Sequence, residues 1–270
     1  MENDGVNRIY VVGDEYSGRK TLIASLIYRL MVNAVSLDNV IWSLSGIEHN
    51  AEMTEKSYVI GENMIFSHKI TENFDLKKIF ASILHEVPDS INLEMKINNE
   101  YCGMVEFMNI TGKSNINELW LTEISVILVT VDSEKLVEND RSHIENTLKK
   151  LSETMDFLTE KPRIMFAVTK ADTLNERLKK DDFREFYRLF DENADLLVSY
   201  CMKNAMIYGK RAVSSANEFT EKVFDNYGML LDEPDFDPWE VDKLFRDIIC
   251  LSVPLMHDRL KNIIKQCNNT

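Results

Sequence analysis

A glycine-containing loop near the N-terminus carries residue types that bind phosphate groups. It has the sequence GDEYSGRKT and lies between a predicted strand and a predicted helix. Such a loop can direct backbone N–H groups at phosphate oxygens, and the helix dipole adds positive charge. A Lys at its end can reach the outer phosphates, and a Thr hydroxyl can ligate Mg²⁺. The candidate phosphate-binding residues are Gly13, Gly18, Arg19, Lys20 and Thr21, with Thr21 also a candidate metal ligand.

This loop can be aligned with a phosphate-binding loop in two registers. The two glycines have the required mutual spacing, but the Lys–Thr pair then arrives one residue late. Aligning Lys20 and Thr21 instead leaves Asp14 and Arg19 where glycines are expected. We favour the second register because Thr21 then opens the apolar helix. Taken alone, the segment is equally explained by an ordinary strand–turn–helix connection.

A second motif follows the apolar segment RIMFAV, where the chain continues as Thr169-Lys170-Ala171-Asp172. Here the sequence resembles the guanine-nucleotide-binding proteins of the Ras-like (TRAFAC-class) P-loop GTPases, whose base-recognition motif is [NT]KxD. A carboxylate at Asp172 can accept two hydrogen bonds, from guanine N1–H and N2–H₂, which adenine cannot supply. The resemblance also implies that the Lys170 stem lies along the base. Thr169, Lys170 and Asp172 are therefore candidate nucleotide-binding residues.

Two further segments resemble motifs of the same class and occur in the same order. Asn109 and Gly112 stand where that class has DxxG, whose Asp holds a Mg²⁺-bound water and whose Gly N–H meets the γ-phosphate. The resemblance makes Gly112 a candidate nucleotide-binding residue and Asn109 a candidate metal site. Lys113 follows, where Ras-like enzymes place the Gln that orients water. Ser215 and Ala216 resemble the SA[KL] loop that contacts the guanine carbonyl.

Predicted strands and helices alternate along the chain, and these elements must position the residues named above. The alternation predicts an α/β fold with a mostly parallel central sheet, one antiparallel hairpin strand and helices on both faces. Each motif follows a predicted strand, and the carboxyl ends of strands are where open α/β sheets place ligands. The predicted strands are Arg8–Gly13, Ile91–Ile97, Met104–Met108, Ile124–Val131, Arg163–Thr169 and Lys210–Ser214.

Apolar side chains at helical spacing predict the helices. The first begins at about Lys20 and the last at about Trp239, where Pro254 is expected to introduce a kink. Between them the pattern predicts helices over Asp75–Val87 and Glu138–Phe157, and a long helical region ending near Tyr208.

The chain is predicted to form a single GTPase-like domain over residues 1–270 with two additions. Residues 36–90 form a less regular insertion, and residues 225–242 form a loop with seven acidic and no basic residues. The threonine that senses nucleotide state in Ras-like proteins is not assigned, because Thr54, Thr71 and Ser90 all remain candidates. Ser90 fits best because it precedes the predicted hairpin.

Composition narrows the function classes. The 270 residues include 31 Lys and Arg and 45 Asp and Glu, a net charge of −14 that opposes nucleic acids and anionic lipids. No apolar run is long enough to span a bilayer, and the N-terminus is unlike a secretory signal. The four Cys form no CxxC pair and the His residues show no zinc spacing, so we expect a cytoplasmic protein with reduced thiols.

Three functions follow from these patterns. The favoured one is a guanine-nucleotide-binding switch that uses Mg²⁺, with weak or absent intrinsic GTP hydrolysis, as a slow GTPase. The departures at Arg19, Asn109 and Lys113 support an alternative, a pseudo-GTPase scaffold that does not bind nucleotide. An ATP-using P-loop enzyme fits the first loop but leaves the two base-reading segments unexplained. A protein partner with a basic surface is expected, and the acidic loop is its candidate contact.

Overall fold

The computed structural model describes residues 6–32, 35–37, 40–44, 55–59, 65–69, 87, 89–97, 100–112, 124–158, 160–174, 184–213 and 240–252. Within these ranges the main sheet has eight strands in the order β10-β9-β8-β1-β7-β6-β3-β2. The six strands nearest the site are β1 (Val6–Gly13), β6 (Ile91–Ile97), β7 (Glu100–Met108), β8 (Ile124–Asp132), β9 (Arg163–Thr169) and β10 (Tyr208–Ala212).

Five of these strands run parallel to one another, in the order β10, β9, β8, β1 and β7. The next strand, β6, is antiparallel to β7. Parallel strands are buried on both faces, which requires continuous apolar runs rather than alternation. Ile9 and Val11 in β1, and Val129 in β8, accordingly have no exposed surface. The predicted α/β fold with a mostly parallel sheet and an antiparallel hairpin strand is confirmed.

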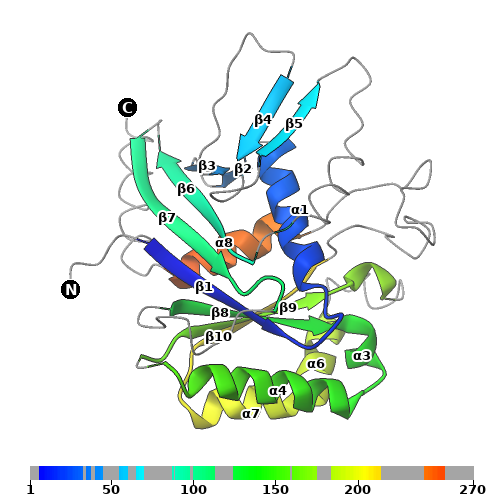
Figure 1. Ribbon diagram of the computed structural model, residues 1–270. Coiled ribbons are helices and arrows are strands. Elements are labelled where there is room, and N and C mark those ends of the chain that lie inside the picture. The colour runs from blue at the N-terminus through cyan, green and yellow to red at the C-terminus, as the bar shows by residue number, and fades with distance from the viewer. Residues whose placement is uncertain are drawn as a thin grey trace, which may run out of the picture.

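Helices cover both faces of the sheet (Figure 1). One face carries α1 (Arg19–Val32) and α8 (Val241–Ser252), and Phe245 of α8 stacks on Phe107 of β7 with 6.3 Å between ring centroids. The bounds of the helices on the other face are α3 (Ser133–Val137), α4 (Arg141–Met155), α6 (Arg184–Asn193) and α7 (Asp195–Lys203).

Several predicted boundaries are wrong, and local hydrogen bonds explain them. The helix predicted over Glu138–Phe157 is α4, which begins at Arg141 because the Asp140 side chain accepts from the backbone N–H groups of Ser142 and His143, and the short helix α3 precedes it. The helical region predicted to reach Tyr208 ends at Lys203. The last strand begins at Tyr208, two residues before its predicted start, and α8 begins at Val241.

The predicted insertion contains strands that the sequence patterns did not indicate. The short strands β2 (Val35–Leu37) and β3 (Val40–Leu44) extend the main sheet beyond β6 as antiparallel additions. Strands β4 (Glu55–Val59) and β5 (Ile65–Lys69) pair with each other in a separate sheet. Most of the helix predicted over Asp75–Val87 lies outside the described residues.

The order of the strands determines where a ligand can bind. Strand β1 lies between β7 and β8. The helices that follow β1 and β8, which are α1 and α4, lie on opposite faces of the sheet (Figure 1). In open α/β sheets, a crevice forms at the carboxyl ends of the strands at such a switch point. The loop after β1, the loop after β7 and the loop after β9 all leave the sheet at this end, because these strands are parallel.

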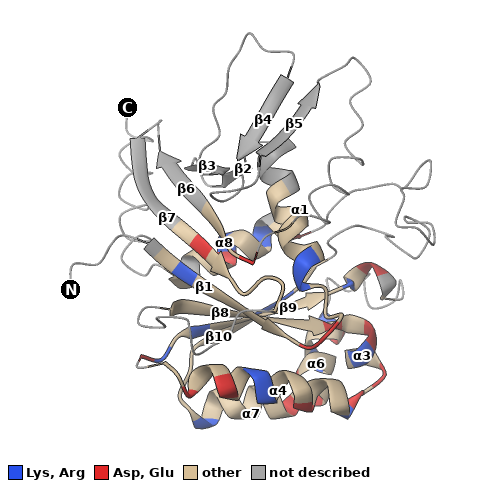
Figure 2. Cartoon of the chain, in the orientation of Figure 1, with Lys and Arg blue, Asp and Glu red and all other residues tan. Residues whose placement is uncertain are grey.

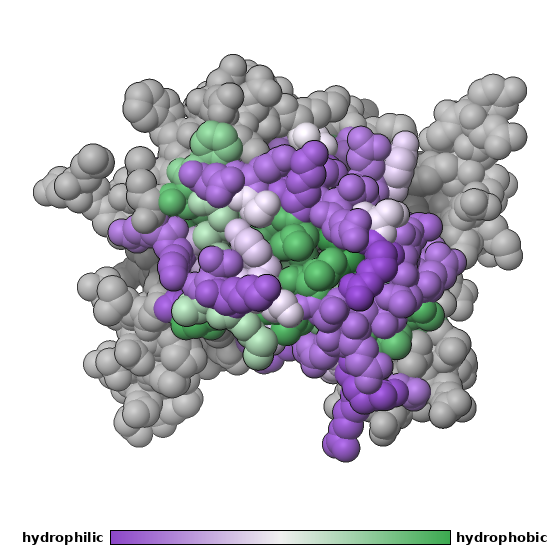
Figure 3. Space-filling view, turned by 90° about the horizontal axis from the view of Figure 1, so that it is seen from below, coloured by the Kyte–Doolittle hydropathy of each residue, from purple (hydrophilic) through white to green (hydrophobic). Residues whose placement is uncertain are grey.

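None of the helices within the described ranges is long and apolar enough to cross a membrane. Seen from the side of α4 and α7, apolar surface appears between hydrophilic residues (Figure 3). Two contributors on that side are Phe157, which follows α4 and is 48% exposed, and Met202 in α7, which is 68% exposed. This face is therefore not fully covered by the described chain.

The Tyr10 hydroxyl of β1 is buried and has no hydrogen-bond partner among the described residues. Burial, with the Asp89 carboxylate nearby, raises the pKa of Tyr10 to about 12 against the opposing effect of Arg19. A buried hydroxyl without a partner lowers stability, so Tyr10→Phe is expected to raise the free energy of unfolding by about 1 kcal/mol. Urea denaturation measures this. Tyr16→Phe is the control because the Tyr16 ring is 88% exposed, and a loss of stability in Tyr10→Phe would contradict the expectation.

Candidate functional site

The first loop, residues 13–18 between β1 and α1, is fixed by the ends of two neighbouring strands. The hydroxyls of Ser17 and Thr130, at the end of β8, share a hydrogen bond of 2.7 Å. The Thr169 hydroxyl at the end of β9 donates to the Ser17 carbonyl over 2.7 Å. The loop conformation is therefore set by two threonines that terminate buried strands.

Both glycines of the first loop are needed for this packing. A Cβ on Gly13 would lie 2.1 Å from Thr130 Oγ1, which is far inside contact distance. Gly18 has a φ of 81°, and a Cβ there would lie 3.2 Å from Thr169 Oγ1. Tyr16 between them also has a left-handed φ of 61° and is exposed at the mouth of the loop. The glycines predicted as binding residues thus have a backbone role that the structure demonstrates.

A polar network joins the first loop to α4. Lys150 Nζ donates to Asp14 Oδ1 over 3.1 Å and to the Gly13 carbonyl over 3.3 Å. His143 is buried, and its Nε2 accepts from the Asp132 backbone N–H, which assigns the proton to Nδ1. That Nδ1 lies 3.3 Å from Asp14 Oδ2. Asp14 therefore joins the loop to two residues of α4, Lys150 and His143.

This network makes stability depend on acid pH. Partial burial raises the pKa of Asp14, but hydrogen bonds from Lys150 and the Glu15 backbone outweigh it and hold that pKa below 3.8. The stabilisation is therefore complete above the unfolded-state value and is lost as pH falls through the folded-state pKa. Wild type is expected to unfold at higher urea than Asp14→Asn near neutral pH, with the gap closing well below pH 3.8. An unchanged gap at both pH values would contradict this.

Helix α1 begins at Arg19, directly after Gly18. The Arg19 guanidinium crosses to the loop after β7: a Cβ on Gly112 would lie 2.2 Å from Arg19 Nη2. Burial lowers the pKa of Arg19 from its usual 12.5, although Asp89, Tyr10, Asp14 and Glu15 oppose the shift. Arg19 directly follows the second glycine of the loop and is the first residue of α1, two residues before the Thr21 that was expected to open the helix.

Asp89 belongs to the site and was not identified from the sequence. Its Oδ1 accepts from the Thr111 backbone N–H over 2.8 Å and from the Thr111 hydroxyl over 2.6 Å. Its carbonyl accepts from the Ile110 N–H over 2.9 Å. Asp89 thus holds the loop after β7 against the start of β6. Its neighbour Ser90, a candidate switch residue, is exposed, and the other two candidates lie outside the described residues.

Asn109, the candidate metal site, has a left-handed φ of 59°. Its Nδ2 donates to the Val11 carbonyl over 2.9 Å, and its Oδ1 is buried without a hydrogen-bond partner in the described part of the chain. Mg²⁺ is usually held through one or two carboxylates together with substrate phosphates. Within the described ranges no group of three His, Cys, Asp or Glu side chains could hold a metal ion. Asn109 and Thr21, the two candidate metal ligands, thus bring an amide and a hydroxyl but no carboxylate to this end of the sheet.

The loop after β9 is anchored to β8 and β10. Lys170 has a left-handed φ of 57°, and its Nζ lies 2.5 Å from Asp132 Oδ2. Asp132 also caps α3 by accepting from the backbone of Glu134 and Lys135. Ala171 N–H donates to the Val213 carbonyl, so this loop meets the segment that follows β10. The fold therefore brings the second motif beside the segment that leads to the fourth.

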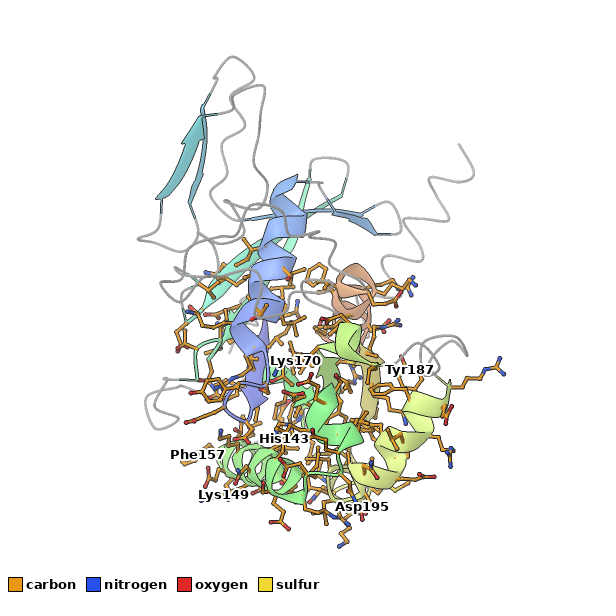
Figure 4. The ribbon with its side chains drawn as sticks, turned by 90° about the vertical axis from the view of Figure 1, so that its right-hand side faces the viewer. His143, Lys149, Phe157, Lys170, Tyr187 and Asp195 are labelled. Carbon is orange, nitrogen blue, oxygen red and sulfur yellow. The ribbon has the colours of Figure 1, made fainter. Side chains whose placement is uncertain are left out.

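Asp172 lies in the short 3₁₀ helix η2 (Ala171–Thr173) and is partly buried. Figure 4 shows Lys170 beside the lower end of α1, whereas Lys149 and Asp195 lie at the lower edge of the molecule. Three residues singled out in the sequence, Lys113, Ser215 and Ala216, lie outside the described residues.

A cleft of about 430 Å³ joins the three loops. This volume lies within the range of small-molecule sites, about 300–1,000 Å³. The first turn of α1 contributes basic residues at its edge (Figure 2). The lining residues are Tyr16, Ser17, Gly18, Arg19, Lys20, Thr21, Ile110, Thr111 and Lys170.

The cations of the cleft differ in their partners. Lys170 is paired with Asp132. Arg19 and Lys20 form no ion pair within 4.0 Å among the residues that the structure describes, and Asp89 influences Arg19 only at longer range. Two partly buried cations, without ion pairs in the described part of the chain, therefore line one cleft at the N-terminus of a helix. This arrangement favours an anionic ligand.

Comparison with known proteins finds no matching family model and no matching curated relative. Function is therefore inferred from the site itself.

Proposed function

We propose that this protein binds a guanine nucleotide in the cleft and hydrolyses GTP weakly or not at all. The observation that carries the proposal is the pair of cations, Arg19 and Lys20, which line the cleft without carboxylate partners within salt-bridge distance in the described chain. Two positive charges beside the N-terminus of α1 suit a di- or triphosphate. The amides of the first loop and the two side chains would hold the phosphates together.

The loop after β9 supports guanine as the base. Asp172 follows a buried strand at the same edge of the sheet as the first loop, and Lys170 already lines the cleft. A carboxylate accepts from both N1–H and N2–H₂ of guanine, whereas adenine offers no such pair of donors. The ATP-using alternative gives Asp172 no role, so guanine is the better assignment.

Weak hydrolysis is supported by the residue types of the segment that resembles the DxxG motif. Lys113 follows Gly112 in sequence, and a protonated Lys is a donor with no acceptor that could orient an attacking water. Asn109 is neutral and its amide group is committed to the Val11 carbonyl. Neither position offers a general base.

Calorimetric titration with GDP, a non-hydrolysable GTP analogue and ADP tests the proposal. We expect GDP and the GTP analogue to bind and ADP to bind at least about tenfold more weakly. Phosphate release from GTP should remain below the slow intrinsic rate of Ras, about 10⁻⁴ s⁻¹. Equal affinity for ADP would contradict guanine recognition, and faster turnover would contradict the weak-hydrolysis assignment.

A second candidate function is a scaffold that keeps this fold without binding nucleotide. The specific observation in its favour is that the Arg19 guanidinium lies against Gly112 and links the first loop to the loop after β7. In this case the protein would show no heat of binding with any of the three nucleotides. The acidic residues 225–242, expected to contact a basic protein partner, would then be its main functional surface. In either role we place the protein in the cytoplasm.

A further inference from the structure

We propose that the cleft holds its phosphate groups without a divalent cation, and that the Lys20 ammonium supplies the positive charge that Mg²⁺ would otherwise bring. This inference rests on the proposed nucleotide binding and adds to it the charge that neutralises the phosphates. It departs from the expectation of a Mg²⁺ cofactor that the sequence resemblance implied.

The start of α1 places Lys20 where a metal would be needed. Arg19 is the first residue of the helix and Lys20 the second, so both lie beside any anion bound at the N-terminus. Both side chains line the cleft, and neither forms an ion pair within 4.0 Å among the described residues. The two cations therefore contribute a charge of about +2, and no carboxylate of the described residues lies within salt-bridge distance of either.

The carboxylates around the cleft already have other partners. Asp132 is paired with Lys170, and Asp14 with Lys150 and His143. Asp89 accepts two hydrogen bonds from Thr111. A divalent ion would have to take one of these carboxylates from its donors. Their engagement leaves the described part of the site without a ready anionic ligand for Mg²⁺.

A lysine ammonium and a magnesium ion cannot occupy the same position against the phosphates, because like charges at that distance repel each other. The ammonium has three donors and imposes no octahedral geometry, so it can contact phosphate oxygens directly. Arg19 adds a planar fork of donors next to it. Lys20, the second residue of α1, would thus neutralise the phosphate charge in place of a metal ion, together with Arg19.

Titration of the wild-type chain with GDP in millimolar MgCl₂ and again in EDTA measures the dependence on metal. We expect the two dissociation constants to agree within about threefold. Weakening by more than about threefold in EDTA would overturn the inference. GDP that bound in neither buffer would overturn the proposed nucleotide binding as a whole, a result distinct from metal dependence.

Lys20→Ser provides the second arm, because a hydroxyl at this position can ligate Mg²⁺. The variant is expected to bind GDP at least about tenfold more weakly than wild type in EDTA, and MgCl₂ should restore part of the affinity. Lys149→Ser is the matched control, because Lys149 is 75% exposed and lies at the lower edge of the molecule (Figure 4). Circular dichroism and the melting temperature check that Lys20→Ser is folded. A folded Lys20→Ser that binds GDP in EDTA with wild-type affinity would also overturn the inference.

Discussion

Replacing Arg19 with alanine is expected to weaken GDP binding by roughly 100-fold, about 3 kcal/mol. The guanidinium is partly buried, lines the cleft and has no ion-pair partner within 4.0 Å in the described chain, so its charge is available to a phosphate. Hydrogen bonds to charged groups each contribute about 1.5–3 kcal/mol, and the fork of an arginine can make two. Calorimetric titration of both proteins with GDP gives the change.

Arg188→Ala is the matched control, because the Arg188 side chain is 66% exposed and pairs with Glu192 on the surface of α6. It should leave GDP affinity unchanged. Arg19→Lys should retain the charge but lose the planar fork, and so fall between wild type and Arg19→Ala. Arg19→Ala with wild-type affinity would show that this side chain links the two loops and does not contact the ligand.

Asp172→Ala is expected to abolish the preference for guanine. GDP affinity should fall by roughly 100-fold, because two hydrogen bonds to a carboxylate are lost together. ADP affinity should not change, since adenine does not use them. Selectivity against ADP therefore separates a lost base contact from general damage to the cleft.

Asp195→Ala serves as the control for this variant. Asp195 is exposed at the start of α7, pairs with Arg141 and lies far from Lys170 in Figure 4. Its replacement should leave the affinities for both nucleotides unchanged. An equal loss of GDP and ADP affinity in Asp172→Ala would contradict a role in reading the base.

The central strands could be predicted from the sequence because each is a short apolar run that must be buried on both faces. Strands β6 and β9 have the bounds that were predicted, Ile91–Ile97 and Arg163–Thr169. Strands β2 and β3 could not be predicted in the same way, because they are short additions whose pairing with β6 depends on tertiary context.

The sequence predicted that the motif-bearing loops follow strands at one edge of the sheet, but not which side chains of these loops contact one another. The order of the motifs placed three loops at one edge of the sheet, and Gly18, Lys170 and Thr169 lie together there. Thr21 was expected to open the helix, but α1 begins at Arg19, because apolar spacing marks the body of a helix better than its first residue. Arg19 could be placed only once the start of α1 and its approach to Gly112 were known.

Asp89 could not be found by pattern, because its partner Thr111 lies 22 residues away in sequence. The available signal was a carboxylate just before a predicted hairpin strand, next to the hydroxyl residue Ser90. The network of Asp14, His143 and Lys150 is equally long-range. Contacts of this kind follow from sheet order, which the sequence specifies only through the whole fold.

The net charge of −14 is not distributed evenly around the cleft, as the contacts of its charged residues show. Three acidic residues near the cleft, Asp14, Asp89 and Asp132, are each engaged by donors, while Arg19 and Lys20 remain available to a ligand. A cationic cleft in an acidic chain selects small anions over polyanionic surfaces, because long-range repulsion acts on large partners while close contacts act on the ligand.

Hydrogen–deuterium exchange with and without saturating GDP tests the central claim most directly, because it reports where the nucleotide binds. We expect GDP to slow amide exchange in residues 13–21, 109–112 and 169–172, which form the three loops of the cleft. Unchanged exchange in all three segments, or protection confined to another part of the chain, would contradict a guanine-nucleotide site at this edge of the sheet.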